Sequence, residues 1–431
     1  MPFFEQHPLR QTLSDEVHAR PPVALDTPEF VTYLAFVHHE GSAEREPEHL
    51  KALAEQLGLP EPTTCSGHLL LESPHFRLKW ERHNEFSSYC FFRRIDPTDA
   101  NDDYALLHVP AAWRKDIPGQ LLAATHIELR SVVDVPPDTV LHQQSTRGQA
   151  LVASKVADGA GWVLTDFHLH DGFSHFLVLD DGFTPRQAGR IAQRLVEIET
   201  YRVMALLAFP VAKQVGRLLS RAEDELADLM DGMGQARSAE DDRAVLGRLS
   251  RLAAEVERSV ARTTFRFGAA AAYYRLVQQR IEDLREQRLP GFSPIAEFMD
   301  RRLVPAIDTC ASIARRQDDL SARIARNSQL LRTRVDIELE RQNQELLAQM
   351  NRRAKIQLHL QETVEGLSVV AITYYASQLV NYVAKGAKHL IEPLTPEVLT
   401  AASIPVIAGF VYMGLRRMRK LLGKEEGDAH Q

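Results

Sequence analysis

The C-terminal fifth of this 431-residue chain contains two long segments that are almost free of charged residues, at 363–384 and 398–415. Each is close to the ~20 apolar residues that a helix needs to cross a lipid bilayer. The connector between them, 385–397, contains Pro393 and Pro396 and is short enough to require two antiparallel helices. The sequence therefore predicts a two-helix transmembrane hairpin over residues 361–417.

Basic residues flank this predicted hairpin on both outer sides. Arg352, Arg353 and Lys355 precede it, and a basic run follows at 416–420. Positive charge accumulates on the cytoplasmic side of membrane proteins, and residues 1–20 contain no apolar run typical of a signal peptide. We therefore expect a two-pass protein with the lipid bilayer as a partner, both termini in the cytoplasm, and a basic tail at 418–431.

One face of the first apolar segment is polar. It carries Glu365 near its entrance, followed by Ser368, Tyr375, Gln378, Asn381 and Tyr382. Polar groups are costly in hydrocarbon unless other protein groups or water satisfy them. Hydrogen bonding between helices, within the hairpin or between copies of the chain, is the favoured interpretation. The alternative is that this face lines an aqueous path through the membrane.

Long helices are predicted between residues 183 and 360. From Leu246 to Leu284 apolar residues recur in alternating steps of three and four, which is typical of coiled-coil packing. A helix buried in an ordinary globular bundle is the alternative. Residues 306–360 contain no glycine or proline, and at ~1.5 Å per residue they would form a stalk of roughly 80 Å that leads into the first apolar segment.

Residues 1–182 have the pattern of strands with a few helices. Runs such as 30–37, 86–93 and 121–133 are rich in β-branched and aromatic residues, and glycine-containing turns separate several of them. A capping box at 184–187, with Pro185 at the first helical position, marks the change to helices. The expected class is α+β: a mixed or antiparallel α/β domain at 1–182, a helical hairpin and stalk at 183–360, and the membrane hairpin.

Composition argues against several functions. A formal net charge of −7 disfavours a nucleic-acid-binding protein, whose surface would be basic. The three cysteines, Cys65, Cys90 and Cys310, are far apart, so neither a disulfide framework nor a cysteine-type zinc site is expected. Because no nucleophile elbow, phosphate-binding loop or dinucleotide-binding turn occurs, we expect a protein that is not an enzyme and that has no cofactor beyond a divalent cation.

A first candidate cation site is formed by Asp166, His168 and His170. These residues alternate along a predicted strand and so share one face, with His175 nearby. Imidazole and carboxylate ligands at this spacing could hold a divalent transition metal. A polar, solvent-facing side of a half-exposed strand gives the same alternation and is the favoured interpretation.

A second candidate cation site is acidic. Glu223, Asp224, Glu225 and Asp228 gather near the predicted tip of the helical hairpin, which we expect to break at 231–234. Oxygen ligands of this kind could bind Mg²⁺ or Ca²⁺ loosely. A solvated acidic tip is the usual explanation of such a charge run.

Several strings resemble a bacterial family of uncharacterised membrane-anchored proteins, a domain of unknown function. They include the opening His7-Pro8-Leu9-Arg10 and the segments 182–188, 197–202 and 363–372. The resemblance covers nearly the whole chain and implies an anchor in the bacterial inner membrane, without catalytic residues. The layout is also similar to that of CorA-type magnesium channels, homopentamers whose first spans line the pore, although their Gly-Met-Asn signature is absent here.

Two hypotheses about function follow. In the first, copies of the chain associate through the stalk and the first apolar segment, and the cytoplasmic part controls a membrane element such as an ion path. In the second, the chain is a membrane-tethered scaffold or sensor that recruits unknown protein partners, and the hairpin only anchors it. The first hypothesis expects a homo-oligomer, in which the polar helix face meets another copy of the chain. Neither hypothesis expects nucleic acid.

Overall fold

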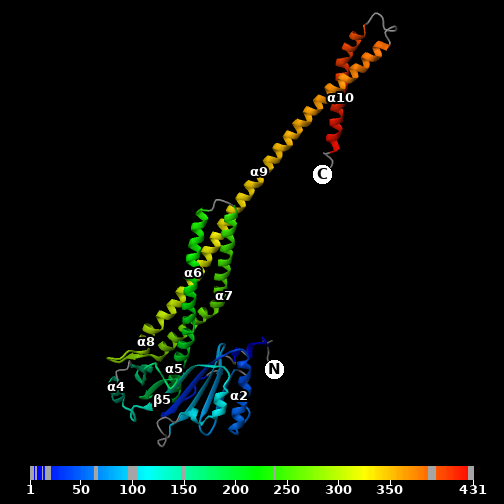
Figure 1. Cartoon of the computed structure of the whole chain (residues 1–431). Helices are drawn as coiled ribbons and strands as arrows, with labels where there is room; N and C mark the ends of the chain where they lie inside the picture. Colours follow the sequence, from blue (N-terminus) through cyan, green and yellow to red (C-terminus); the bar gives the residue numbers. More distant parts are fainter. Residues whose placement is uncertain are drawn as a thin grey trace. The chain divides into compact units, whose positions relative to one another are not determined.

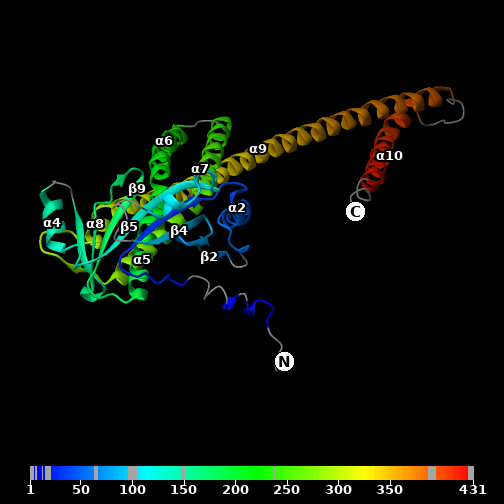
Figure 2. The ribbon, with the colours of Figure 1, turned by 90° about the horizontal axis from the view of Figure 1, so that it is seen from below.

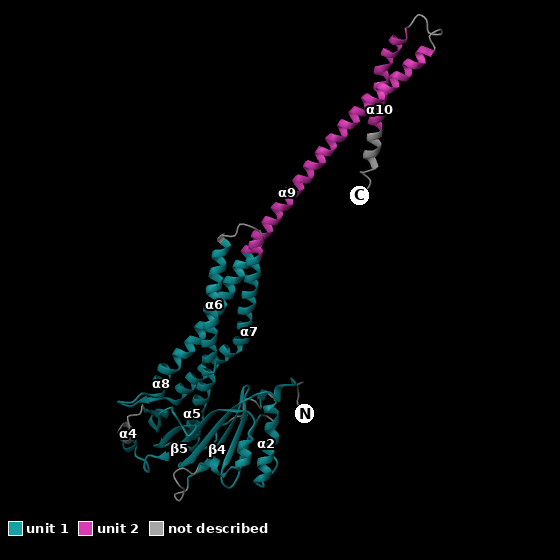
Figure 3. Cartoon of the chain, in the orientation of Figure 1, with its two compact units in different colours: residues 1–236, 244–329 teal, residues 237–243, 330–431 magenta. Residues whose placement is uncertain are grey.

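The computed structural model describes residues 21–62, 67–95, 104–146, 151–235, 239–386 and 395–425, together with 4, 7–11, 13 and 14. Two compact units are present, one of residues 1–236 and 244–329, the other of residues 237–243 and 330–431 (Figure 3). The fold class is α+β, with one mixed sheet and several long helices, as the sequence predicted.

The described strands are β1 (Glu29–Val37), β2 (His68–Glu72), β3 (Arg77–Arg82), β4 (Phe86–Arg94), β5 (Gln120–Ser131), β6 (Val152–Val156), β7 (Gly161–Thr165), β8 (Leu169–His170), β9 (Phe173–Asp180) and β10 (Gln287–Arg288). The described helices are α2 (Ser42–Gln56), α3 (Ala111–Lys115), α4 (Pro137–Thr146), α5 (Pro185–Leu206), α6 (Ala208–Gln235), α7 (Ala239–Leu284), α8 (Ile295–Arg302), α9 (Val304–Gly386) and α10 (Pro396–Glu425). Two short 3-10 turns, η1 (Ala105–His108) and η2 (Ala157–Gly159), complete the elements (Figure 1).

The strands of the first unit form a single mixed sheet. Its order is β10-β6-β7-β9-β5-β1-β4-β3-β2, with β8 paired to β9. Only the central pair β5–β9 is parallel among the described strand pairs; the others are antiparallel. The register places Thr32 of β1 opposite His126 of β5, and His126 opposite His175 of β9. These three residues therefore form one row across the middle of the sheet.

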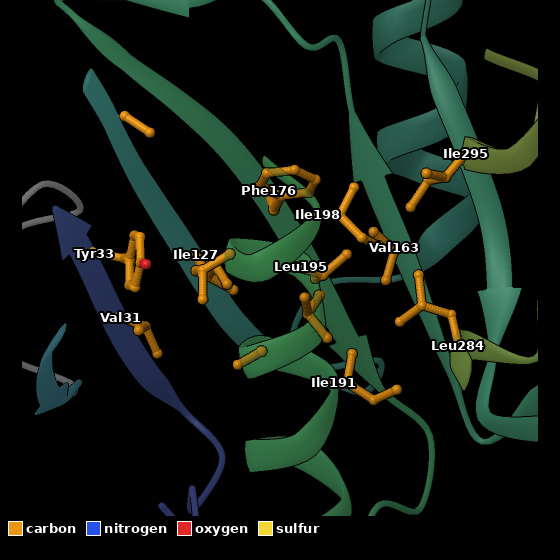
Figure 4. Packing of buried hydrophobic residues seen from close by; sticks show 14 of the residues in the cluster. Val31, Tyr33, Ile127, Val163, Phe176, Ile191, Leu195, Ile198, Leu284 and Ile295 are labelled. Atoms are coloured by element: carbon orange, nitrogen blue, oxygen red, sulfur yellow. The ribbon is translucent and has the colours of Figure 1, made fainter. Parts of the chain in front are cut away.

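Helix α5 covers one face of the sheet and forms the main core with it. The predicted capping box is present, because the Thr184 side chain and Gln187 bond each other's backbone at the start of α5. Apolar residues at helical spacing, Ile191, Leu195 and Ile198, then point toward the strands (Figure 4). Burying side chains of this size contributes about 1.5–3 kcal/mol each, so the helix is fixed on the sheet by this stripe.

The opposite face of the sheet carries two smaller apolar clusters. One lies under α2, η1 and α3 and includes Leu50, Trp80 and Phe91. The other includes Leu164 and Leu179, packed against Val140 and Leu141 of α4. Figure 2 shows α2 and α4 at opposite ends of the sheet. The residue row of β1, β5 and β9 lies between these two clusters.

The first unit continues into a bundle of α6, α7 and the beginning of α9 (Figure 1). The heptad seam of α7 is buried at Leu249, Val256 and Val277. Two further seam residues, Phe267 and Ala270, pack against α6 and α9 of the same chain. The expected break between two helices occurs slightly later than 231–234, because α6 runs on to Gln235 and α7 begins at Ala239. Leu226 and Leu229 are buried, and we attribute the continuation through Gly232 to this packing.

In the second unit, α10 crosses the last part of α9 in the view of Figure 1, and the two helices line a common groove. Within the described residues, one helical stretch is long and apolar enough to cross a membrane: Pro396–Arg417, with a mean hydropathy of 1.9 and none of it buried. The expected first crossing at 363–384 does not reach that standard, so the two-helix membrane hairpin is not supported. Its tyrosine, glutamine and asparagine side chains lower the hydropathy of this part of α9. Most of the predicted connector lies outside the described residues.

Candidate functional site

The expected alternation of Asp166, His168 and His170 along one strand is wrong. β7 ends at Thr165, and Phe167 has a left-handed backbone with φ of 53°. This turn buries the Phe167 ring against Phe176 and Phe298. Apolar packing therefore favours a turn at residues where a continuous strand was predicted.

The same turn still brings part of the predicted triad together. The carboxylate of Asp166 accepts a hydrogen bond from the backbone N–H of His168 at 2.9 Å. Its second oxygen lies 2.7 Å from Nε2 of His170. Burial raises the pKa of Asp166, but these two hydrogen bonds outweigh burial, and the net shift of the pKa is downward.

His170 is the exposed end of a row of imidazoles that crosses the sheet. Its ring centroid lies 5.9 Å from that of His175, which lies 5.3 Å from that of His126. At the inner end, Nδ1 of His126 is 2.9 Å from the hydroxyl of Thr32. Exposure falls along the row, since the His170 side chain is 47% exposed and His126 is 7% exposed. We call Thr32, His126, His175, His170 and Asp166 the histidine row.

Aromatic rings enclose the buried end of the histidine row. The His126 ring is stacked between Tyr104, at 3.8 Å, and Phe173, at 4.0 Å. Burial, with a smaller contribution from His175, lowers the pKa of His126 to about 3. Burial also lowers the pKa of His175. Both imidazoles are therefore neutral near pH 7.

The predicted metal site of Asp166, His168 and His170 is not assembled in the described residues. No group of three histidine, cysteine, aspartate or glutamate side chains with suitable geometry for a metal occurs among the residues that the structure describes. His168 turns its Nδ1 toward the backbone oxygen of Asp166, at 2.9 Å, and so away from a common ligand position. The arrangement instead keeps neutral imidazoles beside a histidine–carboxylate pair, and this makes the stability of the sheet depend on pH.

Sequence reasoning missed His126, Thr32 and Tyr104. His126 lies in the central strand β5, where residues 123–127 are all buried, and nothing in the residues around it distinguishes this histidine from an ordinary polar residue of a strand. Its partner Thr32 is 94 residues away, and the pairing depends on the order of the strands. The local sequence therefore contains no signal that identifies His126 as part of a site.

Behind the histidine row, a buried carboxylate joins α5 to the sheet. Ser174 of β9 donates a hydrogen bond to Glu199 at 2.7 Å. Arg202 donates to both oxygens of Glu199, at 2.5 and 3.0 Å, and its guanidinium lies over the ring of Phe167 at 5.5 Å. Glu199 is 2% exposed. These contacts hold the turn that carries Asp166 in place from the inner side.

The predicted acidic cation site is largely used for ion pairs between helices. Glu223 pairs with Arg316 of α9, which donates to it at 2.7 Å and lowers its pKa. Glu225 lies 3.6 Å from Arg248 of α7. Asp224 and Asp228 are exposed. The cluster lies roughly 10–18 Å before the end of α6, at ~1.5 Å per residue, so it is not at the last turn of the helix.

The polar face predicted for the first apolar segment is only partly exposed, and its two tyrosines point outward from the α9–α10 pair. Tyr375 and Tyr382 are 73% and 72% exposed, and Ser368, Gln378 and Asn381 are half-buried. Between residues 363 and 386, the buried residues of α9 are small: Ser377 and Ala384. Hydrogen bonding inside the hairpin therefore does not account for the two tyrosines.

Glu365 lies in a groove between the two helices. This groove has a volume of about 300 Å³ and is lined by Glu362, Glu365 and Val369 of α9, and by Tyr412 and Arg416 of α10. Carboxylates of one helix thus border the same space as a guanidinium of the other. Such a mixed lining suits the boundary between a bilayer and water.

Comparison with known protein families gives one match. A family described as a protein of unknown function, DUF3422, matches residues 5–422. No curated protein matches the chain. The match covers nearly the whole length and so includes both units and the histidine row.

Proposed function

The chain belongs to the DUF3422 family of proteins of unknown function, and from its own geometry we propose that it is a membrane-anchored protein of the bacterial inner membrane. In this proposal α10 and the last part of α9 cross the bilayer as a hairpin. Copies of the chain associate, and the first unit, on the cytoplasmic side, controls the membrane element that these helices form.

The observation that carries the proposal is the exposure of α10. The stretch Pro396–Arg417 is apolar, and none of it is buried inside the protein. Phe410, Tyr412 and Met413 are each 60% exposed or more. Soluble proteins rarely expose continuous apolar surface of this extent, whereas lipid covers it at no cost.

The lower hydropathy of residues 363–384 is compatible with a second crossing. Apolar side chains there, such as Leu367, Leu379 and Val383, are about as exposed as those of α10. Polar groups in a crossing helix are tolerated where they face protein or water instead of lipid. The outward-facing tyrosines therefore favour association between copies of the chain.

Membrane attachment is tested by separating membranes of expressing cells and washing them at alkaline pH. We expect the full chain to stay in the membrane pellet, and a chain ending at residue 362 to move to the soluble fraction. The matched control is a chain ending at residue 386, which keeps only the first expected crossing. Release of the full chain into the soluble fraction would contradict the proposal.

An ion path is the more specific form of the proposal. Ser368, Tyr375, Gln378, Asn381 and Tyr382 supply polar groups along one face of α9, as a water-filled path requires. The full chain is reconstituted in liposomes with fluorescent dyes for Mg²⁺, K⁺ and H⁺. Flux that is lost in Gln378→Leu with Asn381→Leu supports a path, and flux no faster than in empty liposomes refutes it.

A tethered scaffold or sensor is the second candidate. Among the described helices, only α10 has an apolar stretch long enough to cross a membrane. This favours a chain whose C-terminal part serves only as an anchor. Exchange of residues 361–417 for an unrelated two-span anchor distinguishes the candidates. A cellular phenotype rescued by the exchanged protein would indicate a scaffold, and loss of rescue with correct membrane placement would indicate an active membrane segment.

A further inference from the structure

We propose that α9 assembles with copies of itself as a parallel, in-register coiled coil over residues 339–381, and that the polar face of the first crossing continues the seam of this coiled coil. This inference rests on the proposed membrane attachment, because attachment gives all copies the same orientation. The partner is a second copy of this chain. The proposal concerns only the second unit, to which these residues belong (Figure 3).

Spacing defines the seam. Steps of four and three residues lead from Leu339 through Leu367 to Asn381, which is the heptad spacing of a coiled coil. The seam consists of Leu339, Asn343, Leu346, Met350, Arg353, Gln357, Leu360, Val364, Leu367, Ala371, Tyr374, Gln378 and Asn381. We call these residues the α9 seam.

The apolar members of the α9 seam have no cover within the chain. Leu339 and Leu346 are 45% and 58% exposed, and Leu360 and Leu367 are 67% and 72% exposed. A long single helix in water is stabilised by burial of such a face rather than by its own hydrogen bonds. The seam therefore needs a partner along its whole length.

Charge is arranged to suit a second copy. Between residues 339 and 381, Arg353 is the one charged member of the seam and Glu340 the one charged residue directly beside it. The other charged residues lie on the outer side of the helix: Arg341, Glu345, Arg352, Lys355, Glu362 and Glu365. Arg341 pairs there with Glu338 and Glu345 of its own helix. Two identical helices can therefore approach each other along the seam, and at most positions no like charges face each other.

Polar seam residues favour an in-register arrangement. Asn343 and Gln357 occupy seam positions, where an amide is satisfied by the same amide of a parallel copy at the same level. An antiparallel copy or a shifted one would place these amides opposite leucine or methionine. Desolvation of an unpaired amide is costly, so the register is specified.

The seam continues into the first crossing. Tyr374, Gln378 and Asn381 keep the same spacing, and Ser368, Tyr375 and Tyr382 lie directly beside them. The buried residues Ser377 and Ala384 border one edge of the seam, beside Tyr374 and Asn381. Tyr374 itself is 59% exposed, so the α9–α10 pair leaves the seam uncovered at this level, and Gln378 and Asn381 are half-buried. Association of copies would thus cover the polar groups that are costly in lipid.

The test uses disulfide formation between copies in native membranes. The background is the full chain with Cys65, Cys90 and Cys310 replaced by alanine. Single cysteines are introduced in the seam as Leu339→Cys, Leu346→Cys, Leu360→Cys and Gln378→Cys. Matched controls on the outer side are Arg341→Cys, Lys355→Cys and Ile372→Cys. Copper phenanthroline with dioxygen oxidises neighbouring thiols, and non-reducing electrophoresis separates linked from unlinked chains.

We expect every seam variant to migrate mainly at twice the monomer mass and every control to remain a monomer. Leu339 and Leu360 are roughly 32 Å apart along the helix, at ~1.5 Å per residue, so an antiparallel pair could link at most one of them. Linkage of only one seam site, of none, or of seam and outer sites equally would overturn the inference. The amount of protein in the membrane pellet is measured in parallel. Loss of the protein from the pellet would contradict the proposed membrane attachment, whereas absence of linkage in protein that stays in the pellet would contradict only the coiled coil.

Discussion

His126 shows how a single residue of this sheet is set by long-range pairing. The ring lies between Tyr104 and Phe173, beside His175, and its Nδ1 meets the hydroxyl of Thr32. Its pKa in the folded chain, about 3, is far below the ordinary value of 6.5. Between about pH 3 and 6.5, His126 therefore binds a proton in the unfolded chain and remains neutral in the folded chain.

The first prediction concerns the stability of the first unit in acid. The free energy of unfolding should fall as the pH drops from 6.5 toward 4, and His126 should contribute up to about 1.4 kcal/mol per pH unit. His126→Gln removes this contribution, so its pH slope should be shallower. Urea unfolding followed by tryptophan fluorescence measures the slope, since Trp80, Trp113 and Trp162 all belong to the first unit.

The exposed His142 of α4 provides the control for that measurement. His142→Gln should behave like the original chain in this assay, because His142 is exposed and lies outside the histidine row. Equal slopes for the original chain and His126→Gln would show that His126 is not held neutral by the fold.

The second prediction concerns the buried carboxylate of Glu199. Glu199→Ala leaves Arg202 and Ser174 without their acceptor in the core, and we expect a loss of about 3–5 kcal/mol in the free energy of unfolding. Glu199→Gln keeps an acceptor oxygen and should lose less. The same fluorescence assay measures both variants, and equal losses would contradict a role for the charge.

At the level of elements, local signals predicted some features well. The start of α5 follows from the capping box at 184–187, and β1 follows from the β-branched run at 30–37. Both depend on residues close together in the sequence. The fold class could therefore be predicted, and so could the strand-rich nature of the first part of the chain.

Other features depended on tertiary contacts and could not be predicted. The end of β7 depends on burial of Phe167 among Phe176 and Phe298, which come from elements far apart in sequence. Within the candidate site, the sequence spacing of Asp166 and His170 predicted that these two residues lie close together. The position of His126 could be predicted only with knowledge of the strand order. The extension of α6 beyond Gly232 likewise depends on packing in the bundle.

The third prediction concerns a buried polar contact between α7 and α9. Gln317 donates to Ser259 at 3.0 Å, and Thr263 donates to Gln317 at 3.2 Å. Gln317→Leu leaves the Ser259 hydroxyl without this partner, so we expect a loss of about 1–3 kcal/mol. Adding Ser259→Ala and Thr263→Val should recover most of the loss, because an apolar seam needs no such partner.

Thermal unfolding followed by circular dichroism at 222 nm measures this helical transition. A triple variant that is no more stable than Gln317→Leu alone would show that the three side chains do not act as one group. An unchanged midpoint in the single variant would show that the contact contributes nothing.

At the level of the whole molecule, the two units present different kinds of surface. Among the described residues, the first unit buries its apolar side chains in clusters formed by strands and helices. The second exposes leucine, valine and tyrosine side chains along α9 and α10. Exposed apolar surface of this kind is stable only when lipid or another chain covers it. The proposed membrane hairpin and the α9 seam are two consequences of this one property.

The most direct test of the membrane hairpin is the side of the membrane on which its turn lies. In the chain without native cysteines, Thr395→Cys marks the turn, and Gln361→Cys and Gly423→Cys mark the two outer ends. The cells are treated with a membrane-impermeant maleimide after the outer membrane has been made permeable. We predict labelling of Thr395→Cys alone, with the other two labelled only after the inner membrane is opened. Labelling of all three in intact cells, or of none until the cells are opened, would contradict the hairpin.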